Sequence, residues 1–310
     1  MITFVLKLAV SAGLIWLLLH HTDVEALWAQ ISGVEPAPFA AAVALIAALA
    51  LPATMRWRRV LDVLDHAIAY KPALAIVCIG MFFNQVLPSN VGGDAVRAWL
   101  IRRAGLATRR AITSVVVDRL LGLSVVFLMT AIGLPWLLAL VPHPALRTAF
   151  VVVSGCGLAG LVFLAFLDSL SARLPRWGAI RAAEALSADL RAVLKSRAIV
   201  PVLLLSILIQ VAFALAAYAT SVALGLHVTA LQCLMLVPPV VLVMAVPVSV
   251  AGWGVREGAM VLAFGFIGVD SHDALALSVL IGAATMLASL PGGLVWLMSG
   301  RPRAVPEEVP

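Results

Sequence analysis

Long apolar runs separated by short polar segments dominate the chain. Six of these runs cover about 2–20, 38–55, 111–134, 148–168, 199–225 and 274–298. A bilayer core about 30 Å thick is crossed by roughly 20 helical residues. The pattern therefore predicts six membrane-spanning helices.

Glycine and proline break two further apolar stretches. The first, 72–101, contains a Gly-rich turn, and the second, 230–268, contains Pro238-Pro239 and a similar turn. Each is predicted to be a helix–turn–helix hairpin, and the proline pair is expected to interrupt the first arm of the second one. Irregular backbone at membrane depth must be buried in protein or line a wet cavity. Re-entrant hairpins meet this requirement; the alternative is that the long arms span, which gives seven or eight crossings.

The two turns have related sequences. One reads PSNVGGDAVR and ends at Arg97, and the other reads PVSVAGWGVR and ends 159 positions later at Arg256, with five of ten positions identical. Paired, interrupted hydrophobic segments in the two halves of a chain are typical of transporters. Chance similarity in a Gly- and Val-rich chain is the alternative, but the flanking spans also repeat in the same order.

Basic residues divide the polar segments into two groups. Segments 56–71, 97–110, 169–198 and the tail hold 17 of the 21 lysines and arginines, whereas 20–37, 135–147 and 256–273 hold few. Because basic residues concentrate in cytoplasmic segments, the first group and both termini are predicted to be cytoplasmic. Each half then has an odd number of crossings, so the second half is expected to be inverted relative to the first.

The predicted fold class is thus an all-α polytopic membrane protein, with six spans and two re-entrant helical hairpins in an inverted-topology repeat. Residues 1–134 form the first repeat, 135–300 the second, and 301–310 a disordered tail. Composition agrees, since 63% of the residues are hydrophobic and 12% charged, against about 45–50% and about 25% in soluble domains. The N-terminal run has no basic segment before it, which favours an uncleaved span in the cytoplasmic (inner) membrane.

Charge and reactive side chains narrow the function. The net charge of +6 is accounted for by cytoplasmic loops beside anionic lipids, so nucleic acid is not an expected partner. The three cysteines lie in apolar runs, and the histidines show no metal-binding spacing. No nucleophile elbow or phosphate-binding loop is present, so no catalytic residue, metal or cofactor is predicted.

The strongest binding candidates are Arg97 and Arg256, which occupy equivalent positions of the repeated motif. Each follows a Gly-rich turn where a helix is expected to begin, and a helix N-terminus favours anions. A guanidinium adds bidentate phosphate geometry. The two arginines are predicted to hold a lipid headgroup; for Arg97 the alternative is an ordinary cytoplasmic anchor.

Other polar residues surround these positions. Asn90 lies in the first turn, and Asp94 is expected either to cap the next helix or to pair with an arginine of the opposite hairpin. Asp118 and Arg119 lie inside a span, where charge costs about 2.5–3.5 kcal/mol per residue. They form either a salt bridge that fixes packing or part of a substrate pathway. Glu257 either balances Arg256 or binds a proton or cation.

Three motifs, NQVLPSNVGGDAVR, VVVDRLLGL and AGWGVREGAMVL, together resemble the lysylphosphatidylglycerol synthase transmembrane-region family, also called the UPF0104 or flippase-like family. The resemblance covers essentially the whole chain. It implies functional roles for motif positions Asn90, Gly92, Gly93, Asp94, Arg97, Asp118, Arg119, Gly252, Gly254, Arg256 and Glu257. A second acidic residue is frequent in the family where this chain has Gly122.

In the best-known members the membrane region is fused to a soluble aminoacyl-transferase domain, and it moves the modified lipid to the outer leaflet. This sequence ends about a dozen residues after the last predicted span, so aminoacylation is not expected of it. The leading hypothesis is a flippase-like protein for a phospholipid or a polyprenyl-linked lipid. The alternatives are a membrane-embedded transferase for lipid-linked substrates and a non-catalytic partner of a lipid-modifying enzyme.

Overall fold

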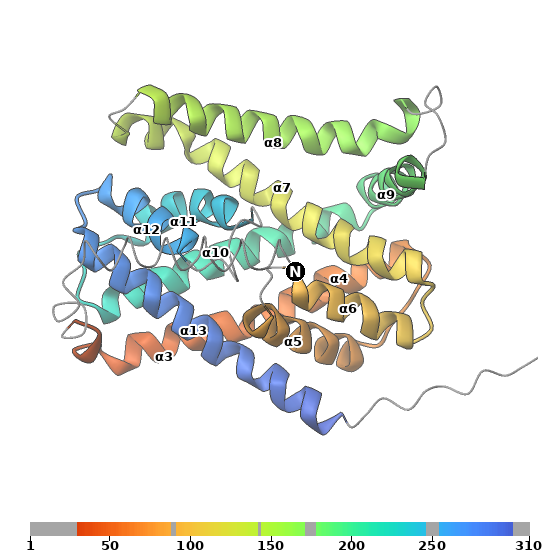
Figure 1. Ribbon diagram of the computed structural model, residues 1–310, viewed down its shortest axis with the longest axis horizontal. Helices are drawn as coiled ribbons and strands as arrows, with labels where there is room; N and C mark the ends of the chain where they lie inside the picture. The colour runs from red at the N-terminus through yellow and green to blue at the C-terminus, as the bar shows by residue number, and fades with distance from the viewer. Residues whose placement is uncertain (1–29, 88–90, 142–143, 171–177, 246–253, 300–310) are drawn as a thin grey trace, which may run out of the picture.

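The computed structural model describes residues 30–87, 91–141, 144–170, 178–245 and 254–299. Every regular element in these ranges is a helix (Figure 1). The predicted span 2–20, the motif residues Asn90 and Gly252, and the tail 301–310 lie outside the described residues. The all-α membrane class is confirmed by the helical content and by five helices long and apolar enough to cross a membrane.

The first half of the bundle runs from α3 to α7. Helices α3 (Pro36–Ala48) and α4 (Ala50–Val63) form one nearly continuous rod, broken only at Leu49; the rod is apolar as far as Met55 and carries charged residues beyond it. Helices α5 (Tyr70–Val86) and α6 (Gly92–Arg103) form a hairpin, and α7 (Thr108–Leu140) is the longest helix among the described residues. The predicted span 38–55 is therefore longer than expected, because α4 continues into a segment that the basic residues had suggested was a loop.

In the second half, a long helix, a helical pair and a last long helix follow one another as in the first half, after two further helices. The second half consists of α8 (Pro144–Leu170), α9 (Gly178–Lys195), α10 (Ile199–Ala223), the pair α11 (Ala230–Ala245) and α12 (Val255–Gly265), and α13 (Ser271–Met298). The prediction that Pro238-Pro239 interrupts the first arm of this hairpin was wrong, since both prolines lie inside α11. Neighbouring groups often satisfy the backbone that proline frees in membrane helices, and both prolines are buried.

Several contacts between helices in one half of the chain have a counterpart in the other half. Helix α5 packs on α6 and α13, and correspondingly α11 packs on α12 and α7. The contacts α6–α7 and α4–α5 likewise have the counterparts α12–α13 and α10–α11. Each hairpin therefore rests against the last helix of the other half, and the two halves are interlocked.

Apolar side chains cover the outside of the bundle. Helix α8 lies along one edge (Figure 1) and packs on α7 and α9. Its side chains Val152, Val162 and Phe163 are 51–60% exposed. Such a large apolar surface is expected where a helix faces lipid.

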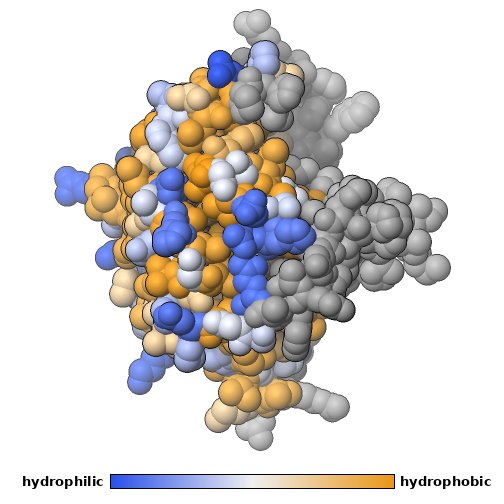
Figure 2. Space-filling model, turned by 90° about the vertical axis from the view of Figure 1, so that its left-hand side faces the viewer, coloured by the Kyte–Doolittle hydropathy of each residue, from blue (hydrophilic) through white to orange (hydrophobic). Residues whose placement is uncertain are grey.

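The two ends of the bundle differ in charge. The α4–α5 and α6–α7 connections and α9 lie toward the right of Figure 1, and the α12–α13 connection lies toward the left. We call the right side the basic end because its exposed residues include Arg59, Lys71, Arg102, Arg103, Arg109, Lys195 and Arg197. Exposed acidic residues of the left-hand connections include Glu35 and Asp270. Figure 2 shows that left end, where hydrophilic residues gather near the middle with hydrophobic surface around them.

Candidate functional site

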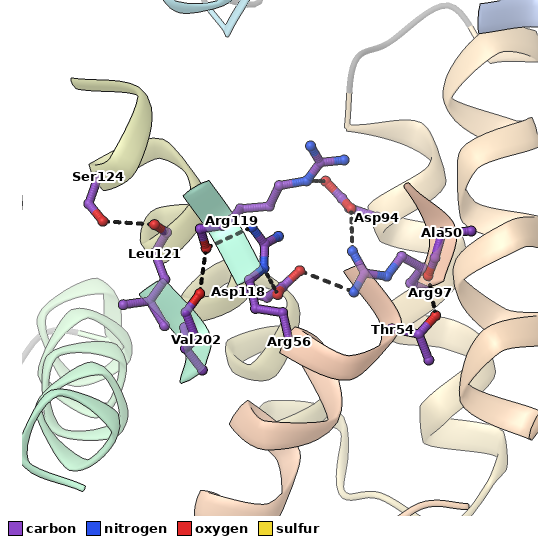
Figure 3. Close-up of polar contacts among 11 residues, drawn as sticks. Ala50, Thr54, Arg56, Asp94, Arg97, Asp118, Arg119, Leu121, Ser124 and Val202 are labelled. Atoms are coloured by element: carbon purple, nitrogen blue, oxygen red, sulfur yellow. Dashed lines mark hydrogen bonds and ion pairs between the residues drawn. The ribbon is translucent and has the colours of Figure 1, made fainter. Parts of the chain in front are cut away.

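Asp118 is the centre of a buried network of charged residues. It lies ten residues into α7, or about 15 Å along the helix, and it is 1% exposed. One carboxylate oxygen accepts a hydrogen bond from Arg56 Nε at 2.8 Å, and the other accepts one from Arg97 Nη2 at 3.2 Å. A single carboxylate thus joins α4, α6 and α7 (Figure 3).

Arg97 is held on several sides. Its Nη1 donates to Asp94 at 3.3 Å, and its guanidinium lies over the Trp57 ring with Cζ 4.6 Å from the ring centre. Such a cation–π contact stabilises a charge that is removed from water. Its Nε, which is buried, has no hydrogen-bond partner among the described residues. The Arg97 side chain is therefore fixed in place, but one of its hydrogen-bond donors remains without an acceptor among the described residues.

Arg119 occupies a different position from its neighbour Asp118. Adjacent helical residues point about 100° apart, and Arg119 reaches to Asp94, with Nε 2.6 Å from Oδ2. Its side chain is 51% exposed, and Figure 3 shows its two terminal nitrogens pointing away from Asp94. Three arginines and two aspartates form this network, so it has a formal charge of +1 and its most exposed cation is Arg119.

Arg56 is the residue of the network that sequence reasoning missed. It is grouped by sequence with the cytoplasmic loop charges, but it is 8% exposed and also donates from Nη1 to Ser206 on α10 at 3.2 Å. The sequence did contain a signal, because the apolar residues Trp57, Val60 and Leu61 follow Arg56 at helical spacing, a pattern that predicts a continuing amphipathic helix. In the structure all three side chains are buried.

Glycines make room for these side chains. A Cβ at Gly80 would lie 2.6 Å from Arg97 Cγ, and one at Gly122 would lie 2.8 Å from Arg56 Nη1. Gly122 therefore lies against a guanidinium in this chain. Because Gly80 and Gly122 have no side chain, the arginine side chains fit between the packed helices.

The turn of the first hairpin depends on a close approach of α5 and α6. A Cβ at Gly93 would lie 1.9 Å from the Gly80 carbonyl oxygen, so no other residue fits between the helices. The Asn84 Oδ1 atom accepts a hydrogen bond from the Gly93 N–H at 2.9 Å. The side chain that accepts a hydrogen bond from a free backbone N–H at the start of α6 is therefore Asn84 and not Asp94. Asp94 forms ion pairs within its own half, with Arg97 and Arg119. Gly92 lies against Leu87.

The second half contains a smaller charged group around Arg256. Arg256 Nη2 lies 2.5 Å from Glu257 Oε1, and its Nε donates to Ser278 at 3.2 Å. Glu257 Oε2 accepts a hydrogen bond from the Gly254 N–H at 2.6 Å, which satisfies the start of α12. Gly254 has a φ of +84°, a conformation that favours glycine. Glu257 thus balances Arg256 and also caps its helix.

The two charged groups occupy corresponding places. Ser278 and Gly282 follow Asp118 and Gly122 by 160 positions, and a Cβ at Gly282 would lie 2.3 Å from Arg256 Nη2. In each half, then, the polar residue accepts a hydrogen bond from the arginine of the repeated motif, Arg97 or Arg256. The glycine four residues later lies against Arg256 in the second half but against Arg56 of α4 in the first. This second correspondence, on α7 and α13, was not predicted because only two of the nine aligned residues 115–123 and 275–283 are identical.

The predicted site residues therefore fall into two groups. Asp94, Arg97, Asp118 and Arg119 are brought together in one network, whereas Gly254, Arg256 and Glu257 form the other. Among the described residues, no group of three or more histidine, cysteine or carboxylate side chains is arranged to hold a metal ion. The first group has three guanidinium groups against two carboxylates, so its formal charge is one that a single anion would balance.

Comparison with known proteins agrees with this description. The family model for the lysylphosphatidylglycerol synthase TM region matches residues 4–292. A UPF0104 membrane protein of Methanothermobacter thermautotrophicus is 28% identical over 100 residues, which is 32% of this chain and 28% of that protein. The match therefore spans little more than a quarter of the relative's length. The chain is a multi-pass membrane protein that belongs to the lysylphosphatidylglycerol synthase transmembrane-region family.

Proposed function

We propose that this protein moves the headgroup of an anionic or zwitterionic lipid, or of a lipid-linked sugar, between the leaflets of the cytoplasmic membrane. The observation that carries the proposal is the charge network around Asp118, with its formal charge of +1 and half-exposed Arg119. Charge at membrane depth is costly and is usually retained for function. A phosphate would neutralise the network.

Arg119 is the group that contacts the headgroup in this proposal. Asp94 holds its Nε, so its terminal nitrogens are oriented for a bidentate contact with a phosphate. Arg97 and Arg256, each 7% exposed and already hydrogen-bonded, were predicted to hold a headgroup as well. In this state they position their neighbours, and a direct contact with lipid requires the hairpins to move.

The mechanism in this proposal rests on an inverted relation between the two halves. Exchange of the two halves reproduces the helix contacts, and the hairpins α5–α6 and α11–α12 lie toward opposite ends of the bundle in Figure 1. Two such hairpins in an inverted arrangement permit alternating access, in which one half rocks against the other around a fixed site. The basic end faces the cytoplasm in this proposal, as the positive-inside rule requires.

Transport in proteoliposomes tests the role of Arg119. Arg119→Gln removes the exposed cation and leaves the pairs of Asp118 with Arg56 and Arg97 in place. A hydrogen bond to a charged group contributes about 1.5–3 kcal/mol, so the rate of lipid translocation should fall about tenfold or more. Arg102→Gln removes an exposed charge from α6 outside the network and is the matched control.

The same assay separates transport from catalysis. Mass spectrometry of the translocated lipid should give an unchanged molecular mass, because no covalent step is assigned to the chain. A modified lipid would favour the transferase alternative. If Arg119→Gln transports at the rate of Arg102→Gln with equal reconstitution, the proposed headgroup site is wrong.

A further inference from the structure

A groove outside the buried charge network lies between α4 and α10, next to the start of α5. Its volume is about 490 Å³ and its lining combines Arg58, Arg59, Asp62 and Tyr70 with apolar side chains that include Met55 and Leu204. Ligand sites commonly measure about 300–1,000 Å³. The groove is therefore large enough for a headgroup with the first part of an acyl chain.

The groove lies near the basic end of the bundle. Arg58 lies five residues before the end of α4, and Leu204 lies five residues after the start of α10. At 1.5 Å per residue, both are about 8 Å from helix ends at the basic end of the bundle. Deeper between the same two helices, the Arg56–Ser206 hydrogen bond closes the interface. The groove thus lies nearer the basic end than this hydrogen bond along α10, and it borders the outer surface at the exposed Met55 and Leu204.

Arg58 is oriented before any ligand arrives. Its Nε donates to the Ile68 carbonyl at 2.8 Å, and its Cζ lies 5.9 Å from the centre of the Tyr70 ring. Its terminal nitrogens make no hydrogen bond to another described residue, and the exposed Arg59 makes none either. Side chains held in this way lose less conformational entropy on binding.

The charges and the apolar wall identify the occupant. Two arginines against Asp62 give the groove a formal charge of +1, which one phosphodiester would balance. Met55 lies one turn deeper along α4 than Arg58 and is 47% exposed, and Leu204, at about the depth of Arg58, is 61% exposed. Both side chains line the groove and give it an apolar wall. A soluble phosphate would leave these apolar side chains exposed, whereas the acyl chain of a lipid would cover them.

We propose that this groove binds an anionic phospholipid of the leaflet at the basic end, with its phosphate between Arg58 and Arg59 and an acyl chain along Met55 and Leu204. The site is separate from the Asp118 network and does not require transport. Bound lipid here holds α4 against α10, and α4 also carries Arg56, a partner of Asp118. The experiment below measures binding only, so its result is independent of the transport assay.

The test reconstitutes the full chain in phosphatidylcholine vesicles with a small fraction of photoactivatable phosphatidylglycerol, or of the matching phosphatidylcholine probe. Crosslinks are mapped by mass spectrometry to residues 51–62 and 200–208. The wild-type chain should be labelled there much more strongly by the anionic probe. Arg58→Gln/Arg59→Gln should lower that labelling about tenfold or more, because the variant loses direct charge-assisted hydrogen bonds to the phosphate.

Two controls decide the interpretation. Arg102→Gln/Arg109→Gln removes the same charge from exposed positions at the same end and should leave labelling of the groove within about twofold, since surface charge alone acts weakly. Leu204→Trp fills the apolar wall without changing charge and should also lower it. Equal effects of the two double variants, equal labelling by both probes, or full competition by soluble glycerophosphate would each overturn the proposal.

Discussion

Asp118 shows how much one buried carboxylate contributes. It accepts hydrogen bonds from two arginines on two other helices, and it is almost fully removed from solvent. In that environment the ion pairs add little net stability over apolar packing, but loss of one partner leaves uncompensated charge. Asp118 therefore fixes which faces of α4, α6 and α7 meet.

Asp118→Ala should destabilise the protein strongly. Arg56 and Arg97 would keep their positive charges in a buried site without their acceptor, at a cost of about 3–5 kcal/mol. Thermal unfolding in detergent, followed by circular dichroism or intrinsic fluorescence, measures the effect. Asp62→Asn, which changes an exposed carboxylate of α4, is the control and should unfold like the wild type; similar unfolding of Asp118→Ala would contradict the assigned role.

Ser278 offers a milder test of the second charged group. Ser278→Ala removes the hydrogen bond to Arg256 Nε, but Arg256 keeps its bonds to Glu257. Loss of one bond to a charged group should therefore cost about 1.5–3 kcal/mol, less than Asp118→Ala. A larger loss for Ser278→Ala in the same thermal assay would show that the two groups are not comparable.

At the scale of helices, glycine decides how closely the hairpins pack. Gly93 meets the Gly80 carbonyl, and Gly292 on α13 meets the Cys78 carbonyl, with ideal Cβ distances of 1.9 Å in both cases. The three helices α5, α6 and α13 therefore touch backbone to backbone. Small residues drive association of membrane helices because they permit this approach.

Gly93→Ala should open the first hairpin. The new methyl group overlaps a backbone atom that cannot rotate away, so the cost should reach or exceed the roughly 1–3 kcal/mol typical of overpacking. Thermal stability and detergent resistance should both fall. Gly160→Ala is the matched control on α8, where a Cβ meets nothing within 4 Å; it should unfold at or slightly above the wild-type temperature, since alanine favours helix.

At the scale of the whole molecule, the proposed inversion places the two hairpins on opposite sides of the membrane. The helix contacts that repeat on exchange of the halves support it, as does the concentration of exposed basic residues at one end. The membrane plane itself follows from the apolar sides of helices such as α8.

Single cysteines test this arrangement in cells. In a background with Cys78, Cys156 and Cys233 replaced by alanine, Ala104→Cys and Ser271→Cys place exposed thiols after the first and second hairpins. A membrane-impermeant maleimide should label Ser271→Cys in intact spheroplasts and Ala104→Cys only after permeabilisation. Labelling of both thiols from the same side would remove the support for alternating access.

Local patterns along the chain were enough to predict the class of the protein, its long apolar helices and most of the charged candidates. Apolar length, basic residues in polar segments and charge inside a span are local properties, and each has a direct cost or benefit in a membrane. For this reason Asp94, Arg97, Asp118 and Arg119 were identified before their contacts were known. The proline pair in α11 misled because neighbouring helices, which a local pattern does not contain, stabilise the backbone there.

The contacts between the charged residues became known only from the packing of the helices. Arg56 is 62 positions from Asp118 and 150 from Ser206, and no spacing along the chain reveals such a contact. The same holds for Gly122 and Gly282, whose importance comes from the guanidinium packed against each. Pairing depends on how helices cross, and crossing is set by small residues and by the other half of the molecule. Arg56 thus belongs to the core of the site, although its sequence context is that of a cytoplasmic loop.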